Sequence, residues 1–367
     1  MISGIINVYK EKGYTSHDVV AKLRGIFRQK KIGHTGTLDP DAEGVLPVCL
    51  GKATRACDLL AEKDKVYEAV LLLGISTDTQ DIGGKVQKEL EVACTEEEIR
   101  EAAGRFVGSY QQVPPMYSAL KVNGRKLCDL ARAGVEVERK PREVTVFSIQ
   151  IGEIALPRVR MRVHCSKGTY IRTLCHDIGQ ALGCGGCMES LLRTRVAMFG
   201  LQDAYRISEI EERVRQAREK ASQEHRAGEE AGKEAPQEHR AGEEAGKEAP
   251  QEHRAGKGIQ KQASQGREDG KGLQEGLSKE CLGGMVMDTD SVFLQYPKLL
   301  VKPEFSKPLY NGNALPLEGL EGWEAGYREL ILRVYDSSHA FVGIYRWEEE
   351  IQKVKPVKIF AEGASGV

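Results

Sequence analysis

The sequence has no excess of either charge, few aromatic residues and no long apolar segment. Its 53 Lys and Arg residues balance 54 Asp and Glu residues, and aromatic residues make up 6% of the chain. Bulk charge therefore neither indicates nor excludes a nucleic-acid partner. No apolar stretch reaches the ~18–20 residues of a membrane-spanning helix, and the short apolar run in MISGIINVYKEKG does not resemble a signal peptide. We expect a soluble, cytoplasmic protein that makes no contact with a membrane.

The sequence also lacks a pattern of metal ligands. Its nine cysteines are odd in number and scattered, which is typical of free thiols in a reducing compartment. Cys184 and Cys187 form a single C-x-x-C pair, and a zinc site would need two further ligands at a suitable spacing. The sequence contains no phosphate-binding loop either. We therefore expect neither a metal nor a cofactor.

A tandem repeat interrupts the chain. The unit QEHRAGEEAGKEAP occupies 223–236, returns at 237–250 and begins again at 251. Because the unit contains no large apolar residue, it cannot bury a face against a neighbouring repeat. The flanking segments have a similar composition, so we predict that 214–284 is a disordered, low-complexity insertion.

Regular elements are predicted on both sides of this insertion. Before it, the hydrophobic pattern and the capping signals favour strands at 2–8, 66–73, 144–153 and 158–165 and helices at 16–27, 96–106 and 171–182. Ser16 is the expected N-cap of the first helix. After the insertion, 303–363 contains short β-rich runs separated by turn signals. These patterns predict an α+β fold with a small β-rich C-terminal domain.

The segment KIGHTGTLDPDAEGVLPVCLGKATR at 31–55 carries the clearest chemical signal. Pro40 favours an extended conformation at Asp39, and the surrounding glycines permit tight backbone turns, so Asp39 is presented on a stiff loop. Three interpretations remain open from these residues alone. The segment is an ordinary polar turn, Asp39 is a carboxylate nucleophile, or Asp39 pairs with Asp41 or Glu43 as in a glycoside hydrolase.

Further motifs separate these interpretations. GHTGTLDPDAEGVLPV closely resembles the signature loop of the TruB-type tRNA pseudouridine synthases, and five further segments resemble motifs of that family in the same order. They are KVYEAVLLLG at 65–74, STDTQDIGG at 76–84, PPMYSALKVNGRKLCDLAR at 114–132, CSKGTYIRTLCHDIG at 165–179 and LGCGGCMESLLRTRV at 182–196. The resemblance covers about 1–212 and resumes near 288–302. A chance match to six ordered motifs is not credible, although any one of the shorter motifs is weak alone.

The resemblance implies a fold and a domain organisation. The implied fold is that of pseudouridine synthases, α+β with a mixed, mainly antiparallel central sheet, flanking helices and a small β-rich PUA-like C-terminal domain. Residues 1–213 would form the catalytic domain, with a mobile thumb at about 110–135. The chain would return to this domain at 285–302, and 303–367 would form the PUA-like domain.

The resemblance assigns catalytic roles to three residues. Asp39 aligns with the nucleophilic aspartate, Arg172 with the arginine paired to it, and Tyr67 with the tyrosine that stacks on the extruded uracil. Each residue type also has an ordinary structural use. An arginine opposite an aspartate can be a plain ion pair, and a tyrosine in a strand usually packs across the sheet.

Three further residues are assigned to substrate binding. His34 aligns with a histidine that helps to bind the RNA loop, Tyr170 with a second tyrosine of the uracil site, and Leu191 with an apolar residue of the base pocket. A loop histidine is more often only hydrogen-bonded, and a leucine is more often ordinary core. The ordered set of motifs, rather than any single residue, favours the functional assignment.

The implied activity is isomerisation of uridine 55 in the T loop of tRNA to pseudouridine, by a monomer that needs no cofactor and no obligatory protein partner. Two alternatives remain, the same chemistry on another RNA and a non-catalytic RNA-binding or tRNA-folding protein. The sequence departs from the family near its start, where Lys10-Glu11-Lys12-Gly13 stands in place of the usual Lys-Pro-x-Gly. The missing proline should loosen this turn, which is not a catalytic position.

Overall fold

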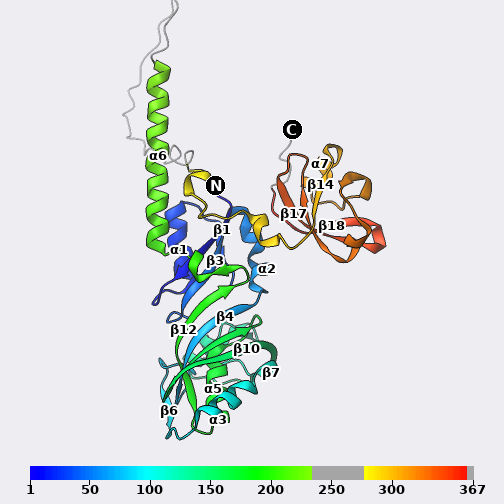
Figure 1. Ribbon diagram of the computed structural model, residues 1–367. Helices are drawn as coiled ribbons and strands as arrows, with labels where there is room; N and C mark the ends of the chain where they lie inside the picture. Colours follow the sequence, from blue (N-terminus) through cyan, green and yellow to red (C-terminus); the bar gives the residue numbers. More distant parts are fainter. Residues whose placement is uncertain (234–276, 362–367) are drawn as a thin grey trace, which may run out of the picture.

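Two β-sheets of different size organise the protein, and the computed structural model describes residues 1–233 and 277–361 (Figure 1). The strands of the larger sheet are β1 (Gly4–Lys10), β2 (Ile32–His34), β3 (Glu43–Leu50), β4 (Lys65–Leu73), β7 (Gly108–Gln112), β10 (Arg142–Ala155), β11 (Arg158–Cys165), β12 (Gly186–Val196) and β13 (Phe199–Gly200). Those of the smaller sheet are β14 (Lys298–Val301), β15 (Leu320–Glu321), β16 (Ile331–Tyr335), β17 (Phe341–Glu348) and β18 (Lys353–Ile359). Two hairpins pair β5 (Ile75–Thr77) with β6 (Val86–Glu89) and β8 (Lys121–Val122) with β9 (Arg125–Lys126). The α-helices are α1 (Ser16–Phe27), α2 (Cys57–Ala61), α3 (Glu96–Gly104), α4 (Leu127–Arg132), α5 (Ile171–Ala181), α6 (Ile207–Lys233) and α7 (Ser306–Tyr310).

The larger sheet is mixed. Its strands follow the order β1-β3-β12-β4-β11-β10-β7, with β2 beside β3 and β13 beside β12. The β3–β12 pair is parallel, and the other pairs are antiparallel. Together with the flanking helices and the smaller sheet, this topology confirms the expected α+β fold with a mainly antiparallel central sheet and a β-rich C-terminal region. No helix in the described part of the chain is both long and apolar enough to span a membrane.

Helices α1 and α6 cover one end of this sheet (Figure 1). The N-cap of α1 is Thr15 and not Ser16, because Thr15 forms a reciprocal capping box with Asp18. The Ser16 hydroxyl instead accepts a hydrogen bond from the backbone N–H of Leu38 at 2.9 Å. The start of α1 is thereby fastened to the loop that carries Asp39.

Helix α6 corrects the expected limits of the insertion. We predicted disorder from 214, but α6 continues to Lys233, and Val214 is 1% exposed against the cluster shared with α1. At the other limit, Leu282 is 2% exposed in the same cluster, although 284 was the predicted end. These side chains bury apolar surface, which stabilises both flanks of the insertion. Most of the tandem repeat falls within 234–276, outside the described residues.

Helices α3 and α5 pack against β4, β11, β10 and β12 at the other end of the sheet. Alternate residues of the strands, such as Leu71 and Val163, are buried against α5 residues such as Leu174 and Ile178. The close approach of α5 to β12 requires glycine at 179, because a Cβ on Gly179 would lie 2.3 Å from the backbone nitrogen of Gly186. The apolar cluster includes Tyr67, so it lies directly beneath the expected uracil site.

The smaller sheet begins earlier than expected. Strand β14 pairs with β15 and β16, so the chain enters this sheet at Lys298 and not at 303. The preceding segment does return to the larger sheet, where Met287 bridges to Ile5. Phe293 then packs with side chains of both units, including Val45 of the larger sheet and Phe360 of the C-terminal unit.

Candidate active site

The loop between β2 and β3, residues 35–42, presents Asp39 and is here called the Asp39 loop. The buried Lys10 ammonium donates hydrogen bonds to the carbonyl oxygens of Pro40 at 3.0 Å and Ala42 at 2.5 Å. Burial lowers the pKa of Lys10 to about 8. The backbone N–H of Gly13 donates to the Pro40 carbonyl at 2.9 Å, so the departure from the family's Lys-Pro-x-Gly pattern leaves this turn connected to the Asp39 loop.

Arg193 of β12 supports the same loop from beneath. Its side chain is among the largest fully buried ones, and its guanidinium donates to the carbonyl oxygens of Val45 at 2.7 Å, Gly36 at 3.4 Å and Thr37 at 3.5 Å. Gly44 allows the backbone of β3 to approach that of β12 closely. It has φ +106°, and a Cβ there would lie 2.2 Å from the Arg193 carbonyl oxygen. A buried cation satisfied by backbone carbonyls fixes the path of the loop.

Asp39 and Arg172 form a bidentate ion pair. Arg172 Nε lies 3.0 Å from Asp39 Oδ2, and Arg172 Nη2 lies 3.3 Å from Asp39 Oδ1. The Arg172 side chain is 7% exposed and that of Asp39 is 41% exposed, so the carboxylate is open to a ligand while its partner is covered. Burial raises the pKa of Asp39, and the Arg172 cation opposes this shift. The fork holds the carboxylate in one plane.

Asp81 is a third member of this group. It accepts from Arg172 Nη1 at 3.3 Å and from the Thr79 hydroxyl at 2.7 Å. Arg172 also donates to the carbonyl oxygens of Thr79 at 3.2 Å and Tyr117 at 2.9 Å. Sequence analysis included Asp81 in the STDTQDIGG motif without giving it a role, because the pairing joins segments that are far apart in the chain.

Tyr67 and Leu191 lie side by side on the sheet. Tyr67 of β4 pairs with Arg193, and Leu191 of β12 pairs with the neighbouring Ala69, so both side chains face the cluster beneath the Asp39 loop. Tyr67 is 8% exposed. Burial raises the pKa of its hydroxyl, and the adjacent Arg193 opposes the shift. Leu191 is only partly buried and provides an apolar surface there.

Tyr170 is fixed through its backbone at the start of α5. The Gln112 side chain accepts from the Tyr170 backbone N–H at 2.8 Å and donates to its carbonyl oxygen at 3.0 Å. Gln112 is 1% exposed and ends β7, where the chain leaves the sheet for the segment at 113–141. Sequence analysis gave Gln112 no role, since a glutamine two residues before a Pro-Pro pair carries no chemical signal of its own.

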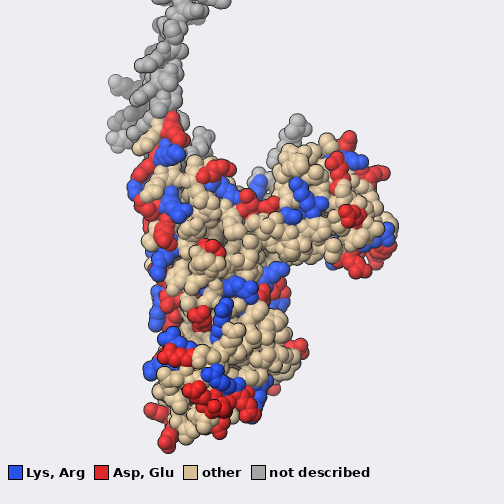
Figure 2. All heavy atoms as spheres, in the orientation of Figure 1, with Lys and Arg blue, Asp and Glu red and all other residues tan. Residues whose placement is uncertain are grey.

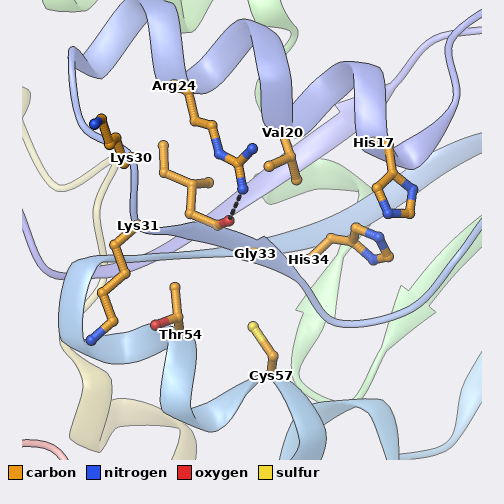
Figure 3. A pocket seen from close by; sticks show the side chains of 10 residues that line it. His17, Val20, Arg24, Lys30, Lys31, Gly33, His34, Thr54 and Cys57 are labelled. Carbon is orange, nitrogen blue, oxygen red and sulfur yellow. Dashed lines mark hydrogen bonds between the residues drawn. The ribbon is translucent and has the colours of Figure 1, made fainter.

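His34 lies apart from the ion pair, at the end of β2. Its Nδ1 accepts from the backbone N–H of Gly36 at 3.3 Å, and its ring meets that of His17 edge to face, with centroids 5.2 Å apart. Burial, aided by the neighbouring His17 and Arg193, lowers the pKa of His34 to about 4. His34 is therefore neutral at pH 7. It faces a pocket that none of the other five assigned residues lines (Figure 3).

The structure thus brings Asp39, Arg172, Tyr67, Tyr170 and Leu191 to one region and places His34 beside it. Among the described residues, no group of three His, Cys, Asp or Glu side chains could hold a metal ion. None of the nine cysteines forms a disulfide. Lys and Arg side chains are interspersed with Asp and Glu over the face shown in Figure 2, so local geometry rather than bulk charge must identify an RNA-binding surface.

Solved structures share the fold. One, described as a Cbf5–Nop10–Gar1 complex, superposes with a TM-score of 0.62 at 24% sequence identity and covers 98% of this chain and 85% of its own. Another, described as an archaeal box H/ACA sRNP Nop10–Cbf5 complex, has a TM-score of 0.61 at 22% identity and covers 98% and 87%. At these identities the likeness shows the fold alone.

Sequence comparison identifies the family. Residues 24–171 match the family model described as TruB family pseudouridylate synthase (N terminal domain), and residues 172–228 match the tRNA pseudouridylate synthase B C-terminal domain. A relative from Lachnoclostridium phytofermentans named tRNA pseudouridine synthase B is 46% identical over 98% of this chain and 100% of its own length. One of the same name from Alkaliphilus oremlandii is 53% identical over 57% of this chain and 70% of its own. The resemblance in the motifs is thereby confirmed, and the chain belongs to the TruB family of pseudouridylate synthases.

Proposed function

We propose that this protein isomerises uridine 55 in the T loop of tRNA to pseudouridine. Family membership and the shared name of the relatives support the activity and the tRNA substrate. The observation that carries the assignment of the site is the bidentate contact between Arg172 and the partly exposed carboxylate of Asp39. Such a contact offers one oriented carboxylate to a ligand, as covalent assistance by a carboxylate requires.

The reaction rearranges one nucleotide without adding or removing an atom overall. The bond from C1′ to N1 breaks, the uracil turns, and a bond from C1′ to C5 forms. N1 gains a proton, and C5 loses one. Because no electron or group is transferred to another molecule, the reaction needs no external reactant, and its demands are base extrusion, orientation and a carboxylate.

We assign the uracil pocket to Tyr67, Tyr170 and Leu191. A stacked aromatic ring replaces the stacking that the base loses on leaving the RNA, a contribution of about 1–3 kcal/mol. The position of Tyr67 beneath the Asp39 loop and the partial exposure of Leu191 support this role. Tyr170, clamped by Gln112, would close the pocket from the side of α5. His34 would contact the RNA loop outside the pocket.

The thumb that closes on RNA was expected at about 110–135, and we propose that it is the segment at 113–141, between β7 and β10. It leaves the sheet after β7, forms the β8–β9 hairpin and α4, and returns at β10. Lys121, Arg125 and Lys126 are exposed on this hairpin, where they would meet phosphates. The contact from Arg172 to the Tyr117 carbonyl joins the base of this segment to Asp39. We further propose that the protein acts as a cytoplasmic monomer without an obligatory protein partner.

One pair of measurements tests the function and its alternatives. The purified protein is incubated with unmodified tRNA transcript, and pseudouridine is mapped by position. We expect modification at uridine 55, whereas modification only at other positions or on other RNAs would redirect the substrate assignment. The Asp39→Asn variant should form no pseudouridine yet bind tRNA within about tenfold of the wild type, because it loses a reacting group and little contact area. Binding without turnover by the wild type would instead favour a non-catalytic tRNA-folding protein.

A further inference from the structure

The pocket that His34 faces lies beside the Asp39 loop, between α1 and the segment formed by η1 (Gly51–Ala56) and α2 (Figure 3). It has a volume of about 510 Å³, within the range of small-ligand sites. Its lining residues come from α1, the α1–β2 connection, β2 and η1–α2, and are His17, Val20, Arg24, Lys30, Lys31, Ile32, Gly33, His34, Thr54 and Cys57. We call this cavity the basic pocket. Of the six residues assigned to catalysis or substrate binding, only His34 lines it.

One end of the basic pocket is positively charged. Figure 3 shows Lys30 and Lys31 on the same side of the cavity, with Arg24 above them. Among the side chains of residues 1–224 and 277–361, no carboxylate lines the cavity, and Arg24, Lys30 and Lys31 form no ion pair. Arg24 Nη2 donates to the Ile32 carbonyl at 3.3 Å, which holds the guanidinium at the cavity. Cations without a counter-charge in a concave site attract a phosphate.

The other end of the basic pocket has a different chemistry. His17 and His34 meet edge to face there, and Val20 and Cys57 line the cavity between the two ends (Figure 3). Flat rings and small apolar groups suit the face of a nucleobase or a ribose. The cavity therefore combines a phosphate-binding end with an end suited to a nucleoside.

We propose that the basic pocket binds one phosphate and its attached nucleoside from the substrate RNA, at a position distinct from the uracil site. The identity of the ligand as RNA rests on the proposed function, whereas the charge and shape of the pocket do not. Strand β2 joins the two sites directly, because Ile32, Gly33 and His34 line the pocket and the Asp39 loop follows at once. A nucleotide held there would fix the RNA strand next to the position where the target base leaves its stack.

The test compares two variants that each remove one exposed lysine. Lys31→Ala removes a cation of the basic pocket, and Lys88→Ala removes one on β6, at the opposite end of the larger sheet (Figure 1). The dissociation constant for tRNA is measured by filter binding at several salt concentrations. We expect Lys31→Ala to raise it about tenfold at low salt and to lower the salt slope by about one, as expected for the loss of one phosphate contact. Lys88→Ala should change neither quantity.

A third variant probes the nucleoside end of the pocket. His17→Ala should weaken tRNA binding without changing the salt slope, because it removes a contact surface rather than a fixed charge. The single-turnover rate at saturating enzyme should match the wild type in Lys88→Ala, because Lys88 lies on β6 and lines neither RNA site. Equal melting temperatures would show that the fold is retained.

Three results would overturn the proposal. The first is wild-type affinity and salt slope in Lys31→Ala, and the second is an equal change in Lys88→Ala, which would indicate general charge alone. The third is calorimetric binding of inorganic phosphate that is lost in Lys31→Ala while tRNA affinity is unchanged, which would make the pocket a site for a free anion. Because binding needs no turnover, a wild-type protein that binds tRNA through this pocket but forms no pseudouridine would refute only the proposed function.

Discussion

Replacing Arg172 with lysine should separate the chemical step from substrate binding. Arg172 divides its donors among both oxygens of Asp39, one oxygen of Asp81 and the carbonyl oxygens of Thr79 and Tyr117. Lysine keeps the charge but offers donors from one point, so it cannot grip both Asp39 oxygens and reach the remaining acceptors. We expect the Arg172→Lys variant to lose on the order of 10²-fold in rate, about 2.7 kcal/mol, as for one preorganised electrostatic contact.

The assay is the single-turnover rate at saturating enzyme, followed across pH. Asp39 must be ionised to act, so the rate falls as pH drops through its pKa. Burial raises that pKa and Arg172 opposes the rise. A lysine placed less closely should oppose it less, so the acid limb of the profile should move to higher pH in the variant. Affinity for tRNA should stay close to that of the wild type.

A surface pair supplies the matched control for Arg172→Lys. Arg158 contacts both oxygens of Glu189 with the same fork geometry, but its side chain is 56% exposed. Arg158→Lys should leave the rate and the pH profile unchanged, because an exposed pair contributes little. If Arg172→Lys isomerises uridine at nearly the wild-type rate with an unshifted profile, Arg172 is a structural ion pair and the reasoning fails.

Three further predictions test other parts of the structure. Asp81→Asn should slow the single-turnover rate by about tenfold, or ~1.4 kcal/mol, without changing tRNA affinity, because it weakens the charge-assisted contact with the Arg172 guanidinium. An unchanged rate would show that Asp81 has no part in the site. Gln112→Ala should lower both the rate and the melting temperature, because two backbone groups of Tyr170 lose their partners, at about 1–3 kcal/mol for each buried group left unpaired. Gln112→Glu should restore only the hydrogen bond donated by the Tyr170 N–H. Replacing 234–276 with a short Gly/Ser linker should leave the melting temperature unchanged, whereas Leu282→Ala should cost about 2–5 kcal/mol in urea unfolding. If the linker replacement destabilised the protein more than Leu282→Ala does, the corrected limits of the insertion would be wrong.

Local sequence patterns predicted the parts of the site that depend on adjacent residues. The Asp-Pro pair and its glycines indicated a stiff loop, and the structure shows Asp39 on such a loop between β2 and β3. The supports of this loop were not predictable in the same way. Lys10 and Arg193 reach it from other strands of the sheet, and a buried cation that donates to backbone carbonyl oxygens leaves no periodic signal in the sequence. Asp81 and Gln112 were missed because their partners, Arg172 and Tyr170, lie far from them in the sequence.

The limits of α6 were predictable in part. Ile207, Ile210, Val214 and Ala217 recur at helical spacing and are all buried, so the apolar pattern continued past the predicted boundary at 213. The charge-rich composition of the repeat drew the prediction of disorder too far toward the N-terminus. The N-cap of α1 was displaced by one residue, because both Thr15 and Ser16 can cap a helix and only the position of Asp18 decides between them.

The apolar cluster around Phe293 has a consequence for cooperativity. Phe341 and Phe360 of the C-terminal unit stack near Phe293, and the same cluster contains Ile5 and Val45 of the larger sheet. Unfolding the C-terminal unit alone would therefore expose apolar surface belonging to its neighbour as well as its own, which raises the free energy of the half-unfolded species. Heat should melt the two units in one calorimetric transition, with a van't Hoff enthalpy close to the calorimetric one. A chain that ends before β14 would expose the apolar residues of the larger sheet that pack against the C-terminal unit. Such a chain should aggregate, although it would still contain the active-site residues.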